Sequence, residues 1–174
     1  ESCQKCLKNS FTNISGLSSC YSCQIGEKSD PGSAKCTSCD AGEAGTGGGG
    51  ECEQCAAGQS RASDDSNAVS CTPCDPGYYQ TNQGQASCLP CIPGTYENDT
   101  GSTTCKDCSI GQHQDAPGND TCLDCDMGQY MNSEGAVNCL NCNPGDFQNL
   151  TGAKLCEKCL KNSFTNISGL SSCH

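Results

Sequence analysis

Apart from cysteine, the apolar side chains of this sequence recur at fixed places and do not form long runs. No stretch of apolar residues approaches the length of a membrane span. An aromatic or imidazole ring stands eight residues after the first cysteine of most Cys-x-x-Cys pairs: Phe11, Tyr79, Tyr96, His113, Tyr130, Phe147 and Phe164. Three early pairs are followed by Lys28, Ala44 and Ser60 instead. We expect each ring to stack over the disulfide of a neighbouring repeat, and a stripe of rings that binds carbohydrate or peptide is the alternative.

The cysteine pairs divide the chain into repeats. Ten pairs begin at Cys3, Cys20, Cys36, Cys52, Cys71, Cys88, Cys105, Cys122, Cys139 and Cys156, and Cys173 opens an eleventh. Successive first cysteines lie 16 to 19 residues apart, most often 17. A period this regular indicates an array in which each repeat is one supersecondary element. The sequence therefore predicts one continuous repeat array over residues 1–174.

Glycine keeps the same register as cysteine at two places in each repeat. It stands six residues after the first Cys, except at Asn9 and Asn162, and four residues before the next pair, except at Asn67. Glycine, and after it Asn, reaches positive φ most readily. We expect two left-handed turns per repeat. Three Pro-Gly pairs fit the centre of a type II turn: Pro76-Gly77, Pro93-Gly94 and Pro144-Gly145.

The composition excludes a single large apolar core. The 174 residues include 21 Cys and 21 Gly but only 3 Phe, 5 Tyr and no Trp. The predicted fold class is small and disulfide-rich: a linear array of about ten 17-residue Cys-x-x-Cys repeats with short β-hairpins and little or no helix, extended into a rod. Without the bridges we expect the chain to be disordered.

The charge and the motifs narrow the function classes. A net charge of −11 argues against nucleic acid and against an anionic membrane surface as partners. The sequence has no nucleophile constellation, phosphate loop or His-rich metal motif. We therefore expect no enzyme, no cofactor, and no catalytic or metal-binding residues.

Three chemistries compete for the cysteines. Disulfides fit the cysteine-rich composition, and the Cys-x2-Cys-x13-Cys-x2-Cys spacing is near that of zinc ribbons. Zinc is disfavoured because the chain is acidic and has only 2 His. A redox Cys-x-x-Cys is disfavoured because no βαβ pattern accompanies the ten copies.

Two disulfide patterns are open from the residues alone. In a ladder, the second Cys of each pair bonds the first Cys of the next: Cys6–Cys20, Cys23–Cys36, Cys39–Cys52, Cys55–Cys71, Cys74–Cys88, Cys91–Cys105, Cys108–Cys122, Cys125–Cys139, Cys142–Cys156 and Cys159–Cys173. Cys3 would then have its partner outside this segment. A crossed pattern, such as Cys3–Cys20 with Cys6–Cys23, would make repeats alternate with a 34-residue period. We see no such alternation in the sequence, which favours the ladder.

One stretch occurs twice. Residues 5–20 (KCLKNSFTNISGLSSC) recur unchanged at 158–173, an offset of 153 residues or nine repeats. We interpret this identity as a duplication of nine repeats, and we expect the polypeptide to continue beyond this segment.

Residues 71–108 (CTPCDPGYYQTNQGQASCLPCIPGTYENDTGSTTCKDC) resemble the ephrin-receptor-like cysteine-rich repeat. They are also similar to the first loop of tumour-necrosis-factor-receptor modules. The likeness covers 71–156 well and the rest by cysteine and glycine register. In the receptor modules a loop of this kind is closed by its own flanking cysteines, so the resemblance implies the ladder. Long arrays of such repeats also look like protist surface proteins, and the family implies a fold without implying one function.

Five Asn-x-Ser/Thr acceptors for N-linked glycans occur, at Asn13, Asn98, Asn119, Asn149 and Asn166. Four of them stand ten residues after a first Cys, and Asn119 lies three residues before Cys122. The function we expect is a structural segment of an extracellular, glycosylated fibre or surface coat, with further copies of itself as its partner. The alternative is an adhesion or receptor ectodomain that binds a protein.

Overall fold

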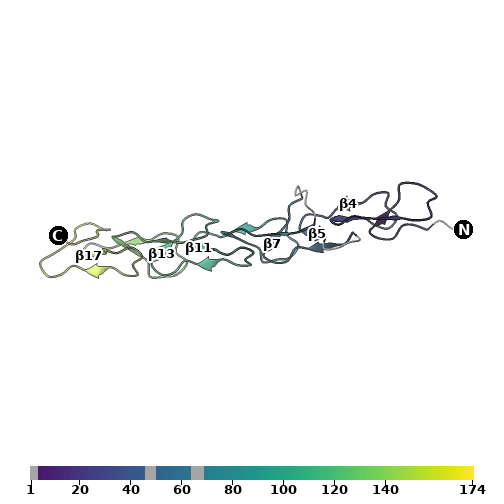
Figure 1. Ribbon diagram of the computed structural model, residues 1–174. Coiled ribbons are helices and arrows are strands. Elements are labelled where there is room, and N and C mark those ends of the chain that lie inside the picture. Colours follow the sequence, from purple (N-terminus) through teal and green to yellow (C-terminus); the bar gives the residue numbers. More distant parts are fainter. Residues whose placement is uncertain (1–3, 46–49, 64–68) are drawn as a thin grey trace. The chain divides into compact units, whose positions relative to one another are not determined.

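In the computed structural model, which describes residues 4–45, 50–63 and 69–174, the chain forms short β-hairpins and no helix (Figure 1). This confirms the predicted small, disulfide-rich repeat array. The chain divides into two compact units. The first comprises residues 1–74, 80–88 and 101–103, and the second comprises 75–79, 89–100 and 104–174.

Within each unit, consecutive strands pair antiparallel in two-stranded hairpins. The first unit contains β1 (Ser10–Phe11) with β2 (Tyr21–Ser22), β3 (Glu27–Lys28) with β4 (Thr37–Ser38), β5 (Glu43–Gly45) with β6 (Cys52–Gln54), and β7 (Gln59–Ser60) with β8 (Thr72–Pro73). The second unit contains β9 (Tyr78–Tyr79) with β10 (Leu89–Pro90), β11 (Thr95–Tyr96) with β12 (Lys106–Asp107), β13 (Gln112–His113) with β14 (Leu123–Asp124), β15 (Gln129–Tyr130) with β16 (Leu140–Asn141), and β17 (Asp146–Phe147) with β18 (Glu157–Lys158).

The hairpin register follows from the repeat. The first strand begins directly after the turn glycine, and in most hairpins the second begins directly after the next repeat's first cysteine. In β15 and β16, Gln129 lies opposite Asn141 and Tyr130 lies opposite Leu140. Where a repeat carries a ring, the ring therefore lies opposite the residue that follows the next repeat's first cysteine. Cross-strand contact between an aromatic and an aliphatic side chain, as between Tyr130 and Leu140, stabilises such a hairpin.

The predicted left-handed turns are confirmed. Gly94 has a φ of 86°, and Asn9 and Asn162, which replace glycine at that register, have φ values of 63° and 69°. The backbone N–H of Tyr78 donates to the carbonyl of Asp75 at 3.0 Å and closes the turn around Pro76-Gly77. The expected turns at Gly48 and Asn67 lie outside the described residues.

Main-chain hydrogen bonds join each repeat to later ones. In the second unit, the N–H of Gly94 donates to Gln114 O at 2.7 Å, the N–H of Gln114 to Ala136 O at 3.0 Å, and the N–H of Gly135 to Cys108 O at 2.9 Å. The same three kinds of bond recur in the first unit. Main-chain hydrogen bonds between repeats thus supply much of the stabilisation that an apolar core supplies in a globular domain.

The turn glycines are also sites of close approach. A Cβ added to Gly94 would lie 2.3 Å from the carbonyl oxygen of Gly135, two repeats further on. The corresponding distance is 2.2 Å from Gly111 to Gly152 O. Glycine is required here by its φ and by the neighbouring backbone, and the sequence indicated only the first of these reasons.

Candidate functional site

The disulfides form the buried centre of every described repeat. The structure contains ten, and they are the ten pairs of the ladder, from Cys6–Cys20 to Cys159–Cys173, with Cα–Cα distances of 5.6 to 5.8 Å. From Cys6 to Cys142, the second cysteine of each Cys-x-x-Cys motif is buried, and Cys91, Cys108, Cys125 and Cys142 are 0% exposed. Cys159, in the last motif, is half-buried. Cys3 lies outside the described residues.

His113 lies against the disulfide Cys125–Cys139. One ring nitrogen and the two sulfur atoms lie within 4.8 Å of one another. Both sulfurs are bonded to each other, so neither is available as a thiolate ligand for zinc. The arrangement is that of a ring packed on the disulfide of the next repeat, as expected for this register.

The five glycan acceptors differ in their surroundings. Asn13, Asn98, Asn149 and Asn166, which share one register, are exposed. Asn119 is half-buried. Its side-chain Nδ2 donates to Ala116 O at 3.0 Å, and its backbone carbonyl accepts the backbone N–H of Glu97 at 3.3 Å.

Lys106 contacts the glycan acceptor residue Asn98 and both of its neighbours in the sequence. Its Nζ donates to Asn98 Oδ1 at 2.8 Å, to Glu97 Oε1 at 2.9 Å and to Asp99 Oδ2 at 2.9 Å. Hydrogen bonds from the ammonium, first to Glu97 and then to Asp99, raise the pKa of Lys106 well above its usual range. The Glu97 side chain is only 4% exposed, so this lysine supplies the positive charge that its buried carboxylate needs.

The sequence analysis did not identify the buried position that directly follows the ring in most repeats. Nine residues after the first Cys, most repeats bury a side chain: Ser29, Arg61, Gln80, Glu97, Gln114, Met131, Gln148 and Thr165. Gln114 shows what the position does, because its Nε2 donates to Thr121 O at 2.8 Å and its Oε1 accepts the N–H of Ala116 at 3.2 Å. The side chain thereby ties the loop of its own repeat together.

Between the repeats that begin at Cys71 and Cys139, glutamine occupies this position in alternate repeats, at Gln80, Gln114 and Gln148, with the same two hydrogen bonds. The earlier repeats do not continue this local alternation, since Thr12 and Gly45 stand at the equivalent places. The alternation does not extend to the disulfides, which are all of one kind. A two-repeat period matches the close approach of turn glycines two repeats apart.

Arg61 is the most unusual occupant of the buried position, at 2% exposed. Its guanidinium donates to the carbonyl of Cys39 at 2.6 Å, to that of Asp40 at 2.8 Å and to that of Glu43. These carbonyls belong to the turn of the preceding repeat. A single side chain thus fastens that turn, which lacks the Pro-Gly pair found in later repeats.

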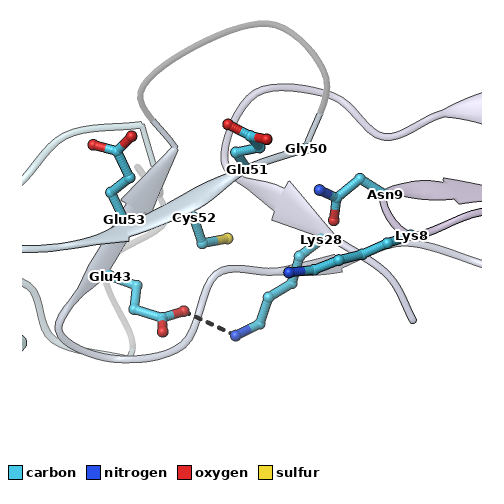
Figure 2. A pocket seen from close by; sticks show the side chains of 8 residues that line it. All are labelled: Lys8, Asn9, Lys28, Glu43, Gly50, Glu51, Cys52 and Glu53. Carbon is cyan, nitrogen blue, oxygen red and sulfur yellow. Dashed lines mark hydrogen bonds and ion pairs between the residues drawn. The ribbon is translucent and has the colours of Figure 1, made fainter. Parts of the chain in front are cut away.

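The first unit contains a charged cavity of about 240 Å³ (Figure 2). Its lining includes Lys8, Asn9, Lys28, Glu43, Gly50, Glu51, Cys52 and Glu53. Lys28 Nζ contacts Glu43 Oε2 at 2.8 Å and Asp40, and its hydrogen bonds to Asp40 and Glu43 raise its pKa. Asn9 Oδ1 is buried and has no partner among the described residues.

The fold defines a small, disulfide-rich repeat module. The family described as tyrosine-protein kinase ephrin type A/B receptor-like matches residues 62–108, 81–120, 94–138 and 111–154. These windows together cover residues 62–154, more than half of the chain, and the chain belongs to this ephrin-receptor-like family. No curated protein sequence matches it.

The family relation and the disulfides together point to an extracellular location. The ephrin-receptor-like cysteine-rich repeat is a non-catalytic module. Over the part of the chain that is described, there is no helix long and apolar enough to cross a membrane.

Proposed function

We propose that this chain is a structural segment of an extracellular, glycosylated fibre or surface coat. The observation that carries the proposal is the uniform way in which repeats are joined. Within each unit the same main-chain hydrogen bonds link each repeat to those that follow, for example Gly84 to Cys55 O and Gly152 to Cys125 O, both at 2.8 Å. Such a joint can be repeated without limit, which suits a fibre.

The proposal includes the extent of the array. Residues 1–174 form one continuous array within a longer polypeptide, and Cys3 bonds a cysteine before Glu1. Since 17 residues reach at most about 58 Å when fully extended, we expect a rod longer than about 100 Å. Negative-stain electron microscopy of the native material, identified with an antibody against the chain, should show thin filaments. Compact particles, or a free Cys3 thiol in the native protein, would contradict the proposal.

The proposed function also predicts N-linked glycans on the surface of the array. We expect N-linked glycans on Asn13, Asn98, Asn149 and Asn166, which the structure leaves exposed, and also count Asn119 among the acceptors. Glycans at a fixed register would keep neighbouring arrays apart. Enzymatic deglycosylation in ¹⁸O-water, followed by mass spectrometry, counts the occupied sites, and fewer than three would contradict this part of the proposal.

A receptor or adhesion ectodomain is the second candidate, and the charged cavity favours it. A binding module is expected to concentrate charge in one or two repeats that depart from the pattern, and the cavity lies among such repeats. Glu51→Lys together with Glu53→Lys reverses two of its charges without touching a disulfide. If the chain works as a receptor, this variant should lose cell-surface binding, whereas a fibre segment should be indifferent.

A further inference from the structure

We propose that Met131 is a modification site, where a peroxide oxidises the thioether to methionine sulfoxide. The new oxygen atom then takes the place that a glutamine or glutamate oxygen holds in the neighbouring repeats, and it accepts the backbone N–H of Ser133. The inference goes beyond the proposed function, because it applies to a fibre segment and to a receptor ectodomain alike.

A side-chain oxygen at the buried position closes the loop in the repeats on both sides of Met131. It accepts the backbone N–H of the residue two positions further on, at 3.0 to 3.2 Å, in the repeats of Gln80, Glu97, Gln114 and Gln148. Met131 holds the same position in the repeat that begins at Cys122. Its side chain carries no oxygen, so this bond is absent there.

The backbone of Met131 is placed like that of the glutamines. The N–H of Met131 donates to Ala153 O and that of Gln114 donates to Ala136 O, both at 3.0 Å. The two carbonyls accept the N–H of a turn glycine in the preceding repeat, at 2.9 and 2.7 Å respectively. Met131 is 6% exposed and Gln114 is 4% exposed. The two side chains therefore start from equivalent points and enter equivalent spaces.

The loop after Met131 contains the donors that such an oxygen needs. The hydroxyl of Ser133 donates to Met131 Sδ at 3.4 Å, so the sulfur atom faces this loop. A thioether sulfur is a weak acceptor, whereas oxidation makes the side chain polar. The backbone N–H of Ser133 corresponds to that of Ala116, which bonds Gln114 Oε1 at 3.2 Å. Within the described chain, the N–H of Ser133 has no acceptor.

Methionine sulfoxide resembles glutamine in its connectivity. In both side chains two methylene groups lead to an atom that carries one oxygen and one further heavy atom. These are Cδ with Oε1 and Nε2 in glutamine, and Sδ with its oxygen and Cε in the sulfoxide. The sulfoxide oxygen can therefore reach the position of Oε1. The methyl group does not replace the donor Nε2, so the sulfoxide reproduces one of the two glutamine bonds.

The oxidation uses a lone pair of the sulfur atom and a peroxide as the oxidant. The sulfur attacks one oxygen of hydrogen peroxide, the O–O bond breaks and an S–O bond forms. The attacked oxygen gives its proton to the departing hydroxide, which leaves as water. Sulfur loses two electrons and the peroxide gains them. Residues 132–134 are exposed, so a local opening of this loop admits a molecule as small as hydrogen peroxide.

The effect on the fold should have an unusual sign. Oxidation of a buried methionine usually disrupts packing, because it places a polar oxygen among apolar atoms. At Met131 the oxygen instead gains a donor, the N–H of Ser133, and the loop is closed as it is beside Gln114. Met127 is 56% exposed and lies in the turn of the same repeat, so it provides an internal comparison for reactivity.

The experiment uses the whole chain with its disulfides intact and with Met127→Leu, which leaves Met131 as the one methionine of the 2 in the sequence. Hydrogen peroxide is the probe, and peptide mass spectrometry follows the addition of one oxygen atom. Amide hydrogen exchange read by NMR then compares Ser133 with Ala116, whose loop is not modified. Adding Met131→Leu gives a matched control that forms no sulfoxide, and adding Met131→Gln supplies the oxygen without peroxide.

We expect Met131 to be oxidised with the fold intact and the amide exchange of Ser133 to slow by about two- to tenfold, the effect of one added hydrogen bond. The amide of Ala116 should not change. Met131→Gln should show the slower exchange before peroxide is added, and Met131→Leu should show no change after it. The decisive comparison is made on the natural Met131, so it does not depend on either variant at this position.

Three results would overturn the proposal. The first is exchange of the Ser133 amide that is unchanged or faster once Met131 is oxidised. The second is a Met131 that stays reduced in the unaltered chain under peroxide that oxidises Met127 completely. The third is equal slowing in the Met131→Leu control, because the effect would then have another source.

Discussion

In a chain of residues 1–174, replacing Gly94 by alanine should be far more damaging than replacing Gly145, although both glycines occupy the same turn position. Their φ values are 86° and 89°, so alanine is strained equally at both, by about 1–2 kcal/mol. At Gly145 the new methyl group meets nothing within 4 Å. At Gly94 it would lie 2.3 Å from Gly135 O, and forcing a methyl group into packed structure adds about 1–3 kcal/mol.

Hydrogen exchange read by mass spectrometry, with the disulfides intact, measures this difference locally. Gly94→Ala should lose about 2–5 kcal/mol of local stability and Gly145→Ala about 1–2 kcal/mol. A difference of about 2 kcal/mol corresponds to roughly 30-fold faster exchange. The effect of Gly94→Ala should extend to the backbone around Gly135, two repeats on. Equal losses in the two variants would refute the argument that repeats pack through their turn glycines.

Other predictions follow from the bridges and the buried side chains. Non-reducing peptide mapping should find Cys91 linked to Cys105, reduction should unfold the chain, and EDTA should leave it intact; unfolding by EDTA would favour zinc. Arg61→Ala, which removes a charged donor from three carbonyls, should cost about 3 kcal/mol in chemical denaturation, and Arg61→Gln should cost less because glutamine serves this position elsewhere. Glu97 raises the pKa of Lys106 in the folded chain, so the ion pair should contribute fully to the free energy of unfolding below about pH 10.4, the pKa of lysine in the unfolded chain. This contribution should be lost as the pH rises through the higher pKa of the folded chain. A ¹³C NMR titration of Lys106 Cε that shows an ordinary lysine pKa would contradict this.

The array and its turns could be predicted from the sequence because both depend on local chemistry. Cysteine spacing fixes the length of a repeat, and positive φ is a property of a single residue, so the asparagines at positions 9 and 162 could be recognised as substitutes for glycine. The register of the rings predicted the contact of His113 with the disulfide Cys125–Cys139. The rings are half-buried, except for that of Phe164, which is exposed.

What the sequence did not indicate depends on contacts between repeats. The buried position is next to the ring and holds Gln, Glu, Arg, Met, Ser or Thr in different repeats, so no pattern of hydropathy marks it. Its polar occupants bond the backbone either of their own repeat, as Gln114 does, or of the preceding repeat, as Arg61 and Thr165 do. The return of glutamine at Gln80, Gln114 and Gln148 was the available signal. The cavity combines Lys8 with Glu51 and Glu53, more than 40 residues away, and only the stacking of repeats brings them together.

The placement of the bridges determines how such an array responds to damage. Each disulfide closes a loop of 13 to 16 residues and none spans several repeats, so each stabilises its own loop by about 3 kcal/mol on the chain-entropy model. The main-chain hydrogen bonds instead connect different repeats, such as Gly111 with Met131 O at 2.9 Å and Gly135 with Cys108 O at 2.9 Å. Cleaving one bridge therefore loosens one loop, while its neighbours keep their own bridges and their own backbone bonds. Stability in this design is close to a sum over repeats and their neighbours, which lets an array grow by duplication without any change in how one repeat folds.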